Sequence, residues 1–414
     1  MVEAVKIEAN GKTEPLETTS LKDQVLEGFD FYKLDERLTD KQRAVRNDVR
    51  AYVNEHVLPN INPYWERAEF PWEIVHGLKD LGIMGGPIWE HGGAGLDFLE
   101  LGLATYELAK GDGSIMTFFG VHSGLAAGSI AMLGSEEQKA RWLPGMMTMD
   151  KIGAFALTEP ARGSNAVDLQ TTARKDGDDY ILNGGKRWIG NASIADLLII
   201  WARDDEDGSF GGYVIEQPNE IEGVIIEDLQ GKIGKRAVLN ANITLNNVRV
   251  PAANRLEHCS SFRDVARVLG LGRYGVAWET AGIAAGAFEL ALKYATERTQ
   301  FDKPIASFQL IQQKLVEMAT EVTLMQMLCF QLSELLTQGQ MDTGIVSMAK
   351  YNNARKARYV TQLARETLGG NGILIENHIA RLMMDAEVSY TYEGTNEINM
   401  LLVGRALTGI SAIT

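Results

Sequence analysis

Hydrophobic residues recur every three to four positions in two regions of the chain, and this spacing predicts helices. In the first region the repeat follows the capping sequence Thr39-Asp40-Lys41-Gln42 and comprises Val45, Val49, Val53 and Val57. In the last region it predicts the seam of a helical bundle: Ile311, Leu315, Met318, Val322, Met325, Cys329 and Leu332. Between the two regions, short apolar and β-branched runs separated by Gly, Asn and Asp predict an antiparallel sheet or barrel.

The changes in this pattern divide the chain into four parts. Residues 1–30, rich in Glu, Thr, Lys and Gly, are expected to form a flexible arm. Residues 31–150 are predicted to form an N-terminal all-α domain, residues 151–261 a middle β-domain, and residues 262–414 a C-terminal α-helical bundle. The predicted fold class is therefore α+β. Within it, the helix that follows the cap at Ser135 is expected to end at Pro144.

Composition narrows the function classes. The chain has 40 basic and 55 acidic residues, a net charge of −15, and 45% hydrophobic residues. An acidic surface repels phosphate backbones, so we expect no nucleic-acid partner. No basic start followed by an apolar run marks a signal peptide, and we expect no apolar stretch near the roughly 18 residues of a membrane helix. The chain is thus expected to be soluble, without a membrane partner.

Cysteine and histidine usage points the same way. Two cysteines, Cys259 and Cys329, are too few for a disulfide framework, which favours a reducing, cytoplasmic compartment. The six histidines show no metal-ligand spacing, so no metal site is predicted.

Five short motifs carry residue types that suit chemistry. They combine a strand-to-turn segment, a hairpin with an aromatic residue, an arginine at a helix end, a glycine pair, and a glutamate in an aromatic setting. They cover residues 155–166, 182–191, 297–309, 368–372 and 390–398.

Each motif alone also has an ordinary structural explanation. Trp188 could be a buried core aromatic, Arg298 a partner of a helix dipole, and Glu393 an exposed loop carboxylate. A carboxylate desolvated among apolar groups would instead have a raised pKa, as a base that removes a carbon-bound proton requires.

In this order and spacing, the five motifs together resemble the acyl-CoA dehydrogenase family over about residues 35–410. Residues 186–191, 232–234 and 403–410 resemble the branch that holds glutaryl-CoA dehydrogenases and the short-chain acyl-CoA oxidase of plant peroxisomes. The resemblance implies an N-terminal helical domain, a middle antiparallel β-domain and a C-terminal four-helix bundle. It also implies FAD as cofactor, an electron-transfer flavoprotein as electron acceptor, and a homotetramer built as a dimer of dimers.

The activity that the resemblance implies is α,β-dehydrogenation of an acyl-CoA to the 2-enoyl-CoA. Glu393 matches the base that removes the α-proton, and a hydride would pass from the β-carbon to the flavin N5. The Glu393 backbone N–H and a ribityl hydroxyl would hold the thioester oxygen. Some relatives place the base near position 272, which is glycine here.

The same resemblance implies the remaining contacts. The flavin ring and the turn beside it would meet Phe155, Leu157, Thr158, Gly163, Ser164, Trp188 and Ile189. A neighbouring subunit's flavin would be reached by Arg298, Phe301, Gln309, Glu366, Gly369 and Gly370. Thr395 and Glu397 match the FAD-contacting stretch after the base, and the substrate would be bound by Ser164, Arg273, Tyr392 and Gly394. Glu366 stands where many relatives carry glutamine.

The acyl group is expected to be short or branched and monocarboxylic, without a distal carboxylate. Glutaryl-specific relatives carry an arginine in the helix after Asp112, whereas residues 115–119 here are mostly apolar, and Trp72 stands where a second arginine would lie. An unpaired buried carboxylate costs several kcal/mol. A short-chain acyl-CoA oxidase, a glutaryl-CoA dehydrogenase and a flavin-free helical interaction protein are the alternatives.

Overall fold

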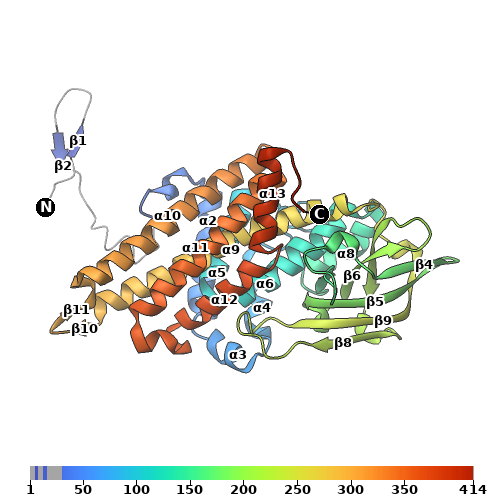
Figure 1. Cartoon of the computed structure of the whole chain (residues 1–414), viewed down its shortest axis with the longest axis horizontal. Helices are drawn as coiled ribbons and strands as arrows, with labels where there is room; N and C mark the ends of the chain where they lie inside the picture. The colour runs from blue at the N-terminus through green and yellow to red at the C-terminus, as the bar shows by residue number, and fades with distance from the viewer. Residues whose placement is uncertain (1–4, 8–12, 16–29, 414) are drawn as a thin grey trace.

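The computed structural model describes residues 5–7, 13–15 and 30–413. Most of the predicted arm, residues 1–30, therefore lies outside the described residues. Within it, β1 (Val5–Ile7) pairs with β2 (Thr13–Pro15) in an antiparallel manner. Figure 1 shows the rest as a helical body with a sheet domain at one end.

The N-terminal part is helical, and capping boxes start its main helices. Both predicted boxes are confirmed: Thr39 and Gln42 exchange hydrogen bonds at the start of α2, and Ser135 and Gln138 do so at the start of α8. The elements are η1 (Leu34–Arg37), α2 (Asp40–Tyr52), η2 (Val53–Val57), α3 (Ile61–Arg67), α4 (Trp72–His76), η3 (Gly77–Leu81), α5 (Phe98–Gly111), α6 (Gly113–Phe119), η4 (Gly120–Ala127), α7 (Gly128–Leu133) and α8 (Glu136–Met147).

Two expectations for this region are wrong. Pro144 does not end its helix, because α8 continues to Met147, with Met146 and Met147 buried in the core. The chain also contains an apolar stretch long enough to cross a membrane by length and composition, residues 113–133, which forms α6, η4 and α7. Within this stretch, 72% of the most apolar window is buried inside the protein, as in the core helix of a globular fold.

The middle domain is a seven-stranded sheet in the order β3-β6-β4-β5-β9-β8, with β7 paired to β6. The expectation of a purely antiparallel sheet is wrong, since β3 and β4 both run parallel to β6. These parallel pairings are possible because long connections separate the paired strands in the chain. The strands are β3 (Gly153–Ala156), β4 (Thr172–Asp176), β5 (Asp179–Gly190), β6 (Leu197–Asp204), β7 (Phe210–Glu216), β8 (Val224–Asp228) and β9 (Asn240–Pro251).

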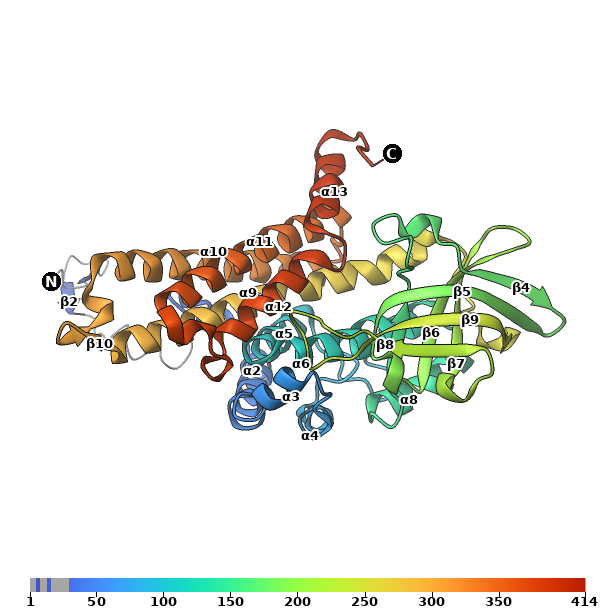
Figure 2. The same cartoon turned by 60° about the horizontal axis from the view of Figure 1, so that its bottom comes forward.

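The C-terminal part is the predicted bundle. Its first helix, α9 (Phe262–Glu297), extends from the bundle toward the sheet domain (Figure 2). It is followed by β10 (Thr299–Gln300), β11 (Lys303–Pro304), η9 (Ile305–Ser307), α10 (Gln309–Thr337), α11 (Thr343–Thr367), η10 (Gly369–Ile373), η11 (Ile375–Asn377), α12 (Ile379–Thr391) and α13 (Asn396–Thr408). The fold is thus the mixed helix and sheet arrangement that the resemblance implied.

The core of the helical body forms where α5 and α10 pack on α9. Tyr106 and Trp278 meet edge to face with ring centroids 6.2 Å apart, and Trp278 also contacts Phe330. Burying side chains of this size stabilises the fold by roughly 1.5–3 kcal/mol each. The helices approach so closely that a Cβ added at Gly282 would lie 2.3 Å from the Tyr106 carbonyl oxygen.

This close approach predicts the effect of one substitution. Gly282→Ala should destabilise the protein by about 1–3 kcal/mol, because α5 and α9 must separate. Gly128→Ala is the matched control: a Cβ there meets nothing within 4 Å, and alanine favours the helix. Thermal melting followed by tryptophan fluorescence should show a lower midpoint for G282A and an equal or higher midpoint for G128A. Equal midpoints in the two variants would contradict this account of the α5–α9 contact.

Candidate active site

Glu393 lies in a strained turn between α12 and α13. Its φ is +53° and that of Gly394 is +80°, so two consecutive residues adopt the left-handed conformation. Two side chains hold this backbone. The Lys350 ammonium donates to the carbonyl oxygens of Tyr390 at 3.2 Å and Gly394 at 2.8 Å, and Asn399 Nδ2 donates to Gly394 O at 2.9 Å.

The turn places the Glu393 carboxylate against a gap in α9. A Cβ at Gly272 would lie 2.5 Å from Glu393 Oε2, so a side chain there would displace the carboxylate. Oε2 is enclosed and has no hydrogen-bond partner among the described residues. Burial raises the pKa of Glu393 from 4.5 to about 7, although Arg273 and Lys350 lower it. This excludes the exposed-loop explanation of Glu393.

Two cations face the same carboxylate from neighbouring helices. Arg273 on α9 is buried, and its Nε also has no hydrogen-bond partner among the described residues. Lys350 on α11 is fully buried, and its burial lowers its pKa from 10.5 to about 8 despite the attraction of Glu393. An unpartnered acid and an unpartnered guanidinium nitrogen are thus enclosed within one region, as expected of a site that binds a polar ligand.

The expected hairpin turn at residues 183–185 is wrong, because β5 continues through it from Asp179 to Gly190. The strand-to-turn motif and this β5 motif lie beside each other in the sheet domain. Arg187 N donates to Thr158 O at 2.8 Å. The buried Lys186 ammonium contacts Glu159 Oε1 at 2.9 Å and Leu157 O at 3.2 Å, which fixes the end of β3 against β5.

Trp188 is not a core aromatic. It is 54% exposed, and its φ of +64° occurs within β5 where the pairing with β9 shifts register between Lys186 and Ile189. Phe155, Leu157 and Ile189 are buried within the apolar clusters of the sheet domain. Thr158 is half-buried, and Gly163 and Ser164 are exposed.

The remaining predicted residues after the base stay close to it. Thr395 caps α13 by accepting a hydrogen bond from Ile398 N at 3.2 Å, and Gly394 is part of the strained turn. Glu397 is exposed and accepts from the Tyr390 hydroxyl at 3.1 Å.

A separate group lies at the other end of the bundle. Figure 1 places β10 and β11, and Figure 2 places β10, at the end opposite the sheet domain, far from the turn between α12 and α13. Glu366 pairs with Lys314 at 2.8 Å. The exposed members are Arg298, Phe301, Gln309, Gly369 and Gly370, with 85% of Phe301 exposed. Within the described chain, this group does not join the Glu393 site.

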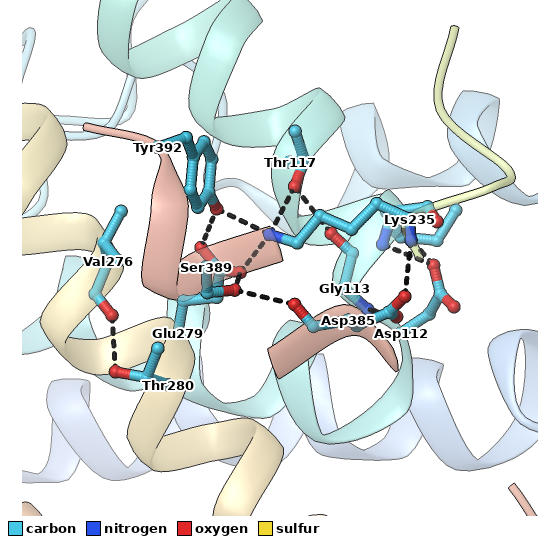
Figure 3. A network of polar contacts seen from close by, with 12 residues as sticks. Asp112, Gly113, Thr117, Lys235, Val276, Glu279, Thr280, Asp385, Ser389 and Tyr392 are labelled. Carbon is cyan, nitrogen blue, oxygen red and sulfur yellow. Dashed lines mark hydrogen bonds and ion pairs between the residues drawn. The ribbon is translucent and has the colours of Figure 1, made fainter. Parts of the chain in front are cut away.

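Sequence reasoning missed a buried polar network beside Glu393, which Figure 3 shows from close by. Lys235, in the loop between β8 and β9, forms an ion pair with Glu279 of α9 and donates to the hydroxyls of Thr117 and Tyr392. The available signal was Glu279, a charged residue within an apolar helical segment, but nothing local indicated its partner. At the surface, Glu90, His91 and Glu136 have ligand atoms within 4.8 Å of one another, a grouping common among exposed acidic residues.

Comparison with known proteins identifies the family. The sequence matches the N-terminal domain of acyl-CoA dehydrogenases at residues 39–150, their middle domain at 154–248 and their C-terminal domain at 262–408. The chain belongs to the acyl-CoA dehydrogenase family. Members of this family are FAD-dependent oxidoreductases that act on the CH–CH bond of an acyl-CoA.

Individual relatives agree over most of the chain. A probable acyl-CoA dehydrogenase of Bacillus subtilis is 34% identical over 89% of this chain and 98% of its own. The short/branched chain specific acyl-CoA dehydrogenase of Bos taurus mitochondria is 30% identical over 89% of this chain and 86% of its own. The structure of a glutaryl-CoA dehydrogenase from Mycobacterium smegmatis in complex with FADH2 has a TM-score of 0.90, at 34% identity, covering 92% of this chain and 98% of that one.

The residues present fit a flavin. Exposed Trp188 follows Arg187, whose backbone N–H donates to half-buried Thr158, and the exposed glycine-serine turn at residues 163–164 offers backbone N–H groups to a polar ring edge. The enclosed Oε2 of Glu393 has no hydrogen-bond partner in the part of the chain that the structure describes, as expected where a ligand completes the site.

The raised pKa of Glu393 has a consequence for stability. A carboxyl group whose pKa rises on folding favours the folded state at low pH, and this advantage is lost as the pH rises through the folded-state value. Glu393→Gln should therefore melt increasingly above the wild type as the pH rises from about 4.5 to 7, with a constant difference above pH 7. Melting temperatures at pH 5 and pH 8 measure this; the exposed Glu397→Gln is the control. A difference independent of pH would contradict the shifted pKa.

Proposed function

We propose that this protein dehydrogenates a short or branched monocarboxylic acyl-CoA to the 2-enoyl-CoA with FAD, and that Glu393 is the base that removes the α-proton. The observation that carries the proposal is the enclosed, unpartnered carboxylate oxygen of Glu393, whose pKa of about 7 suits a base at neutral pH. The chain's membership of the acyl-CoA dehydrogenase family supports the class of reaction, and the geometry of the site supports Glu393 as the base.

Residues around the carboxylate prepare it for proton removal. The strained turn aims Glu393 at the space over Gly272, where the α-carbon would lie. We propose that the Glu393 backbone N–H donates to the thioester oxygen and so acidifies the α C–H bond. Arg273 and Lys350 place positive charge near the site, which favours the ionised base and attracts the polyanionic CoA arm.

Thr158, Trp188 and the turn at Gly163 and Ser164 would hold the flavin. The chemistry that FAD supplies when bound is acceptance of a hydride from the β-carbon. The distant group around Arg298 and Gly369 would reach the flavin of a second copy, which supports a homotetramer built from dimers. Exposed Phe301, Leu310 and Leu407 are apolar surface that such an assembly would cover.

The proposal also names the acyl group, the electron acceptor and the cellular location. The short/branched chain relative and the buried Met116 and Phe118 in α6 favour a short uncharged acyl group. An electron-transfer flavoprotein is the proposed acceptor. The two cysteines are free and buried, which supports a cytoplasmic location.

Replacing the base tests its role directly. Glu393→Gln should retain flavin but lower the rate of flavin reduction by butyryl-CoA by about 10²–10⁴-fold, since the amide cannot accept the α-proton. Anaerobic stopped-flow absorbance follows the reduction, and Glu222→Gln, at an exposed glutamate of the sheet domain, is the matched control. Reduction at the wild-type rate would show that another residue is the base.

A panel of substrates and acceptors tests the rest of the proposal. The flavin should bleach anaerobically with short straight and branched acyl-CoA thioesters and be reoxidised by an electron-transfer flavoprotein without peroxide. Rapid peroxide formation in air would instead establish an acyl-CoA oxidase. A colourless protein that binds no FAD would favour the flavin-free interaction protein.

A further inference from the structure

The ion pair between Lys235 and Glu279 is saturated by hydrogen bonds. Their side chains are 2% and 1% exposed. An ammonium group has three N–H donors, and those of Lys235 go to Glu279 Oε1, the Thr117 hydroxyl at 2.9 Å and the Tyr392 hydroxyl. Glu279 also accepts from Ser389 Oγ at 2.7 Å and from Tyr392 through Oε2. All three N–H donors of Lys235 are used, Glu279 has no donor, and the two charges sum to zero.

Helix α9 places this ion pair in line with Glu393. Gly275 and Glu279 follow Gly272 by three and seven residues, so all three lie on one face of the helix. Gly272 faces the Glu393 carboxylate, and a Cβ at Gly275 would meet nothing within 4 Å, which leaves open space along the face. Glu279 lies two turns, about 10 Å, beyond Gly272. Tyr392 connects the two ends, because it precedes Glu393 and contacts the ion pair.

We propose that Lys235 and Glu279 form the end wall of the acyl site and determine specificity against acyl groups with a distal charge. This inference rests on the proposed function. An acyl chain whose α-carbon lies at Glu393 and whose tail follows the open face of α9 ends at this ion pair. The wall contains a cation, yet Glu279 neutralises it, so a distal carboxylate meets a like charge without a free donor.

The proposal predicts how the wall can be converted. Glu279→Gln retains the size of the side chain but leaves Lys235 uncompensated, so the wall gains one positive charge. The ratio of kcat/KM for glutaryl-CoA to that for pentanoyl-CoA should then rise by about tenfold or more, the change that about 1.4 kcal/mol of differential transition-state stabilisation produces. The two substrates share a chain length and differ in the terminal carboxylate, so the ratio isolates its charge.

Two further variants serve as controls. Ser389→Ala removes one hydrogen bond from Glu279 but retains both charges, and Lys235→Met combined with Glu279→Gln removes both charges. Neither should raise the ratio. The assay uses the purified holoenzyme and anaerobic flavin reduction. If E279Q loses flavin, Glu279→Ala provides the same charge change with more room for the carboxylate.

The outcomes separate this inference from the proposed function. A higher ratio in E279Q alone supports the charged end wall. An unchanged ratio in a flavin-retaining E279Q, or an equal rise in S389A, overturns the inference while reduction by butyryl-CoA upholds the proposed function. If no acyl-CoA reduces the wild-type flavin, the proposed function fails, and this inference fails with it.

Discussion

The insertion of Lys235 between the two helical domains is the interaction that unites the three domains around Glu393. Lys235 comes from a loop of the sheet domain, Thr117 from the N-terminal domain, and Glu279 and Tyr392 from the C-terminal domain. Neighbouring contacts reinforce it, since Ala237 N donates to Ser114 Oγ at 3.2 Å and Arg236 Nε to Trp65 O at 2.9 Å. A buried ion pair of this kind is costly to desolvate, and breaking one partner costs about 3–5 kcal/mol. The pair therefore makes the relative placement of the domains specific.

A second buried lysine performs a different task. Lys350 donates to backbone carbonyls around the left-handed turn, while Oε2 of Glu393 has no hydrogen-bond partner among the described residues. The two lysines thus divide the work. Lys235 neutralises Glu279, whereas Lys350 orders the backbone of the turn that carries Glu393. Glu393, the acid beside Lys350, has a pKa raised by burial to about 7.

Much of the fold could be predicted because its signals are local. The capping boxes at Thr39 and Ser135, the helical seam of α10 and the strand-like runs all act over a few residues. Parallel pairing of β3 with β6 could not be predicted, because it depends on which distant strand lies alongside. The predicted helix end at Pro144 is wrong for a related reason. Burial of Met146 and Met147 in the core outweighs the local preference of proline to end the helix.

The residues of the site likewise differ in whether local sequence or distant contacts reveal them. Glu393 and Trp188 were identified only as members of a motif set, and the structure adds the enclosure of one and the exposure of the other. Lys235 and Glu279 are 44 positions apart, and no spacing rule connects them. Interactions between residues distant in sequence, such as a desolvated ion pair, are what single-sequence reasoning lacks.

The exposed group at the far end of the bundle has a consequence for the behaviour of the protein on dilution. If Arg298, Phe301 and Gly369 serve the flavin of another copy, as proposed, cofactor retention and self-association are linked equilibria. Each would strengthen the other, so the colour of the protein would fade below the concentration at which copies separate, and added FAD would lower that concentration. The residues that distinguish a yellow protein from a colourless one would then include some that never approach their own chain's base.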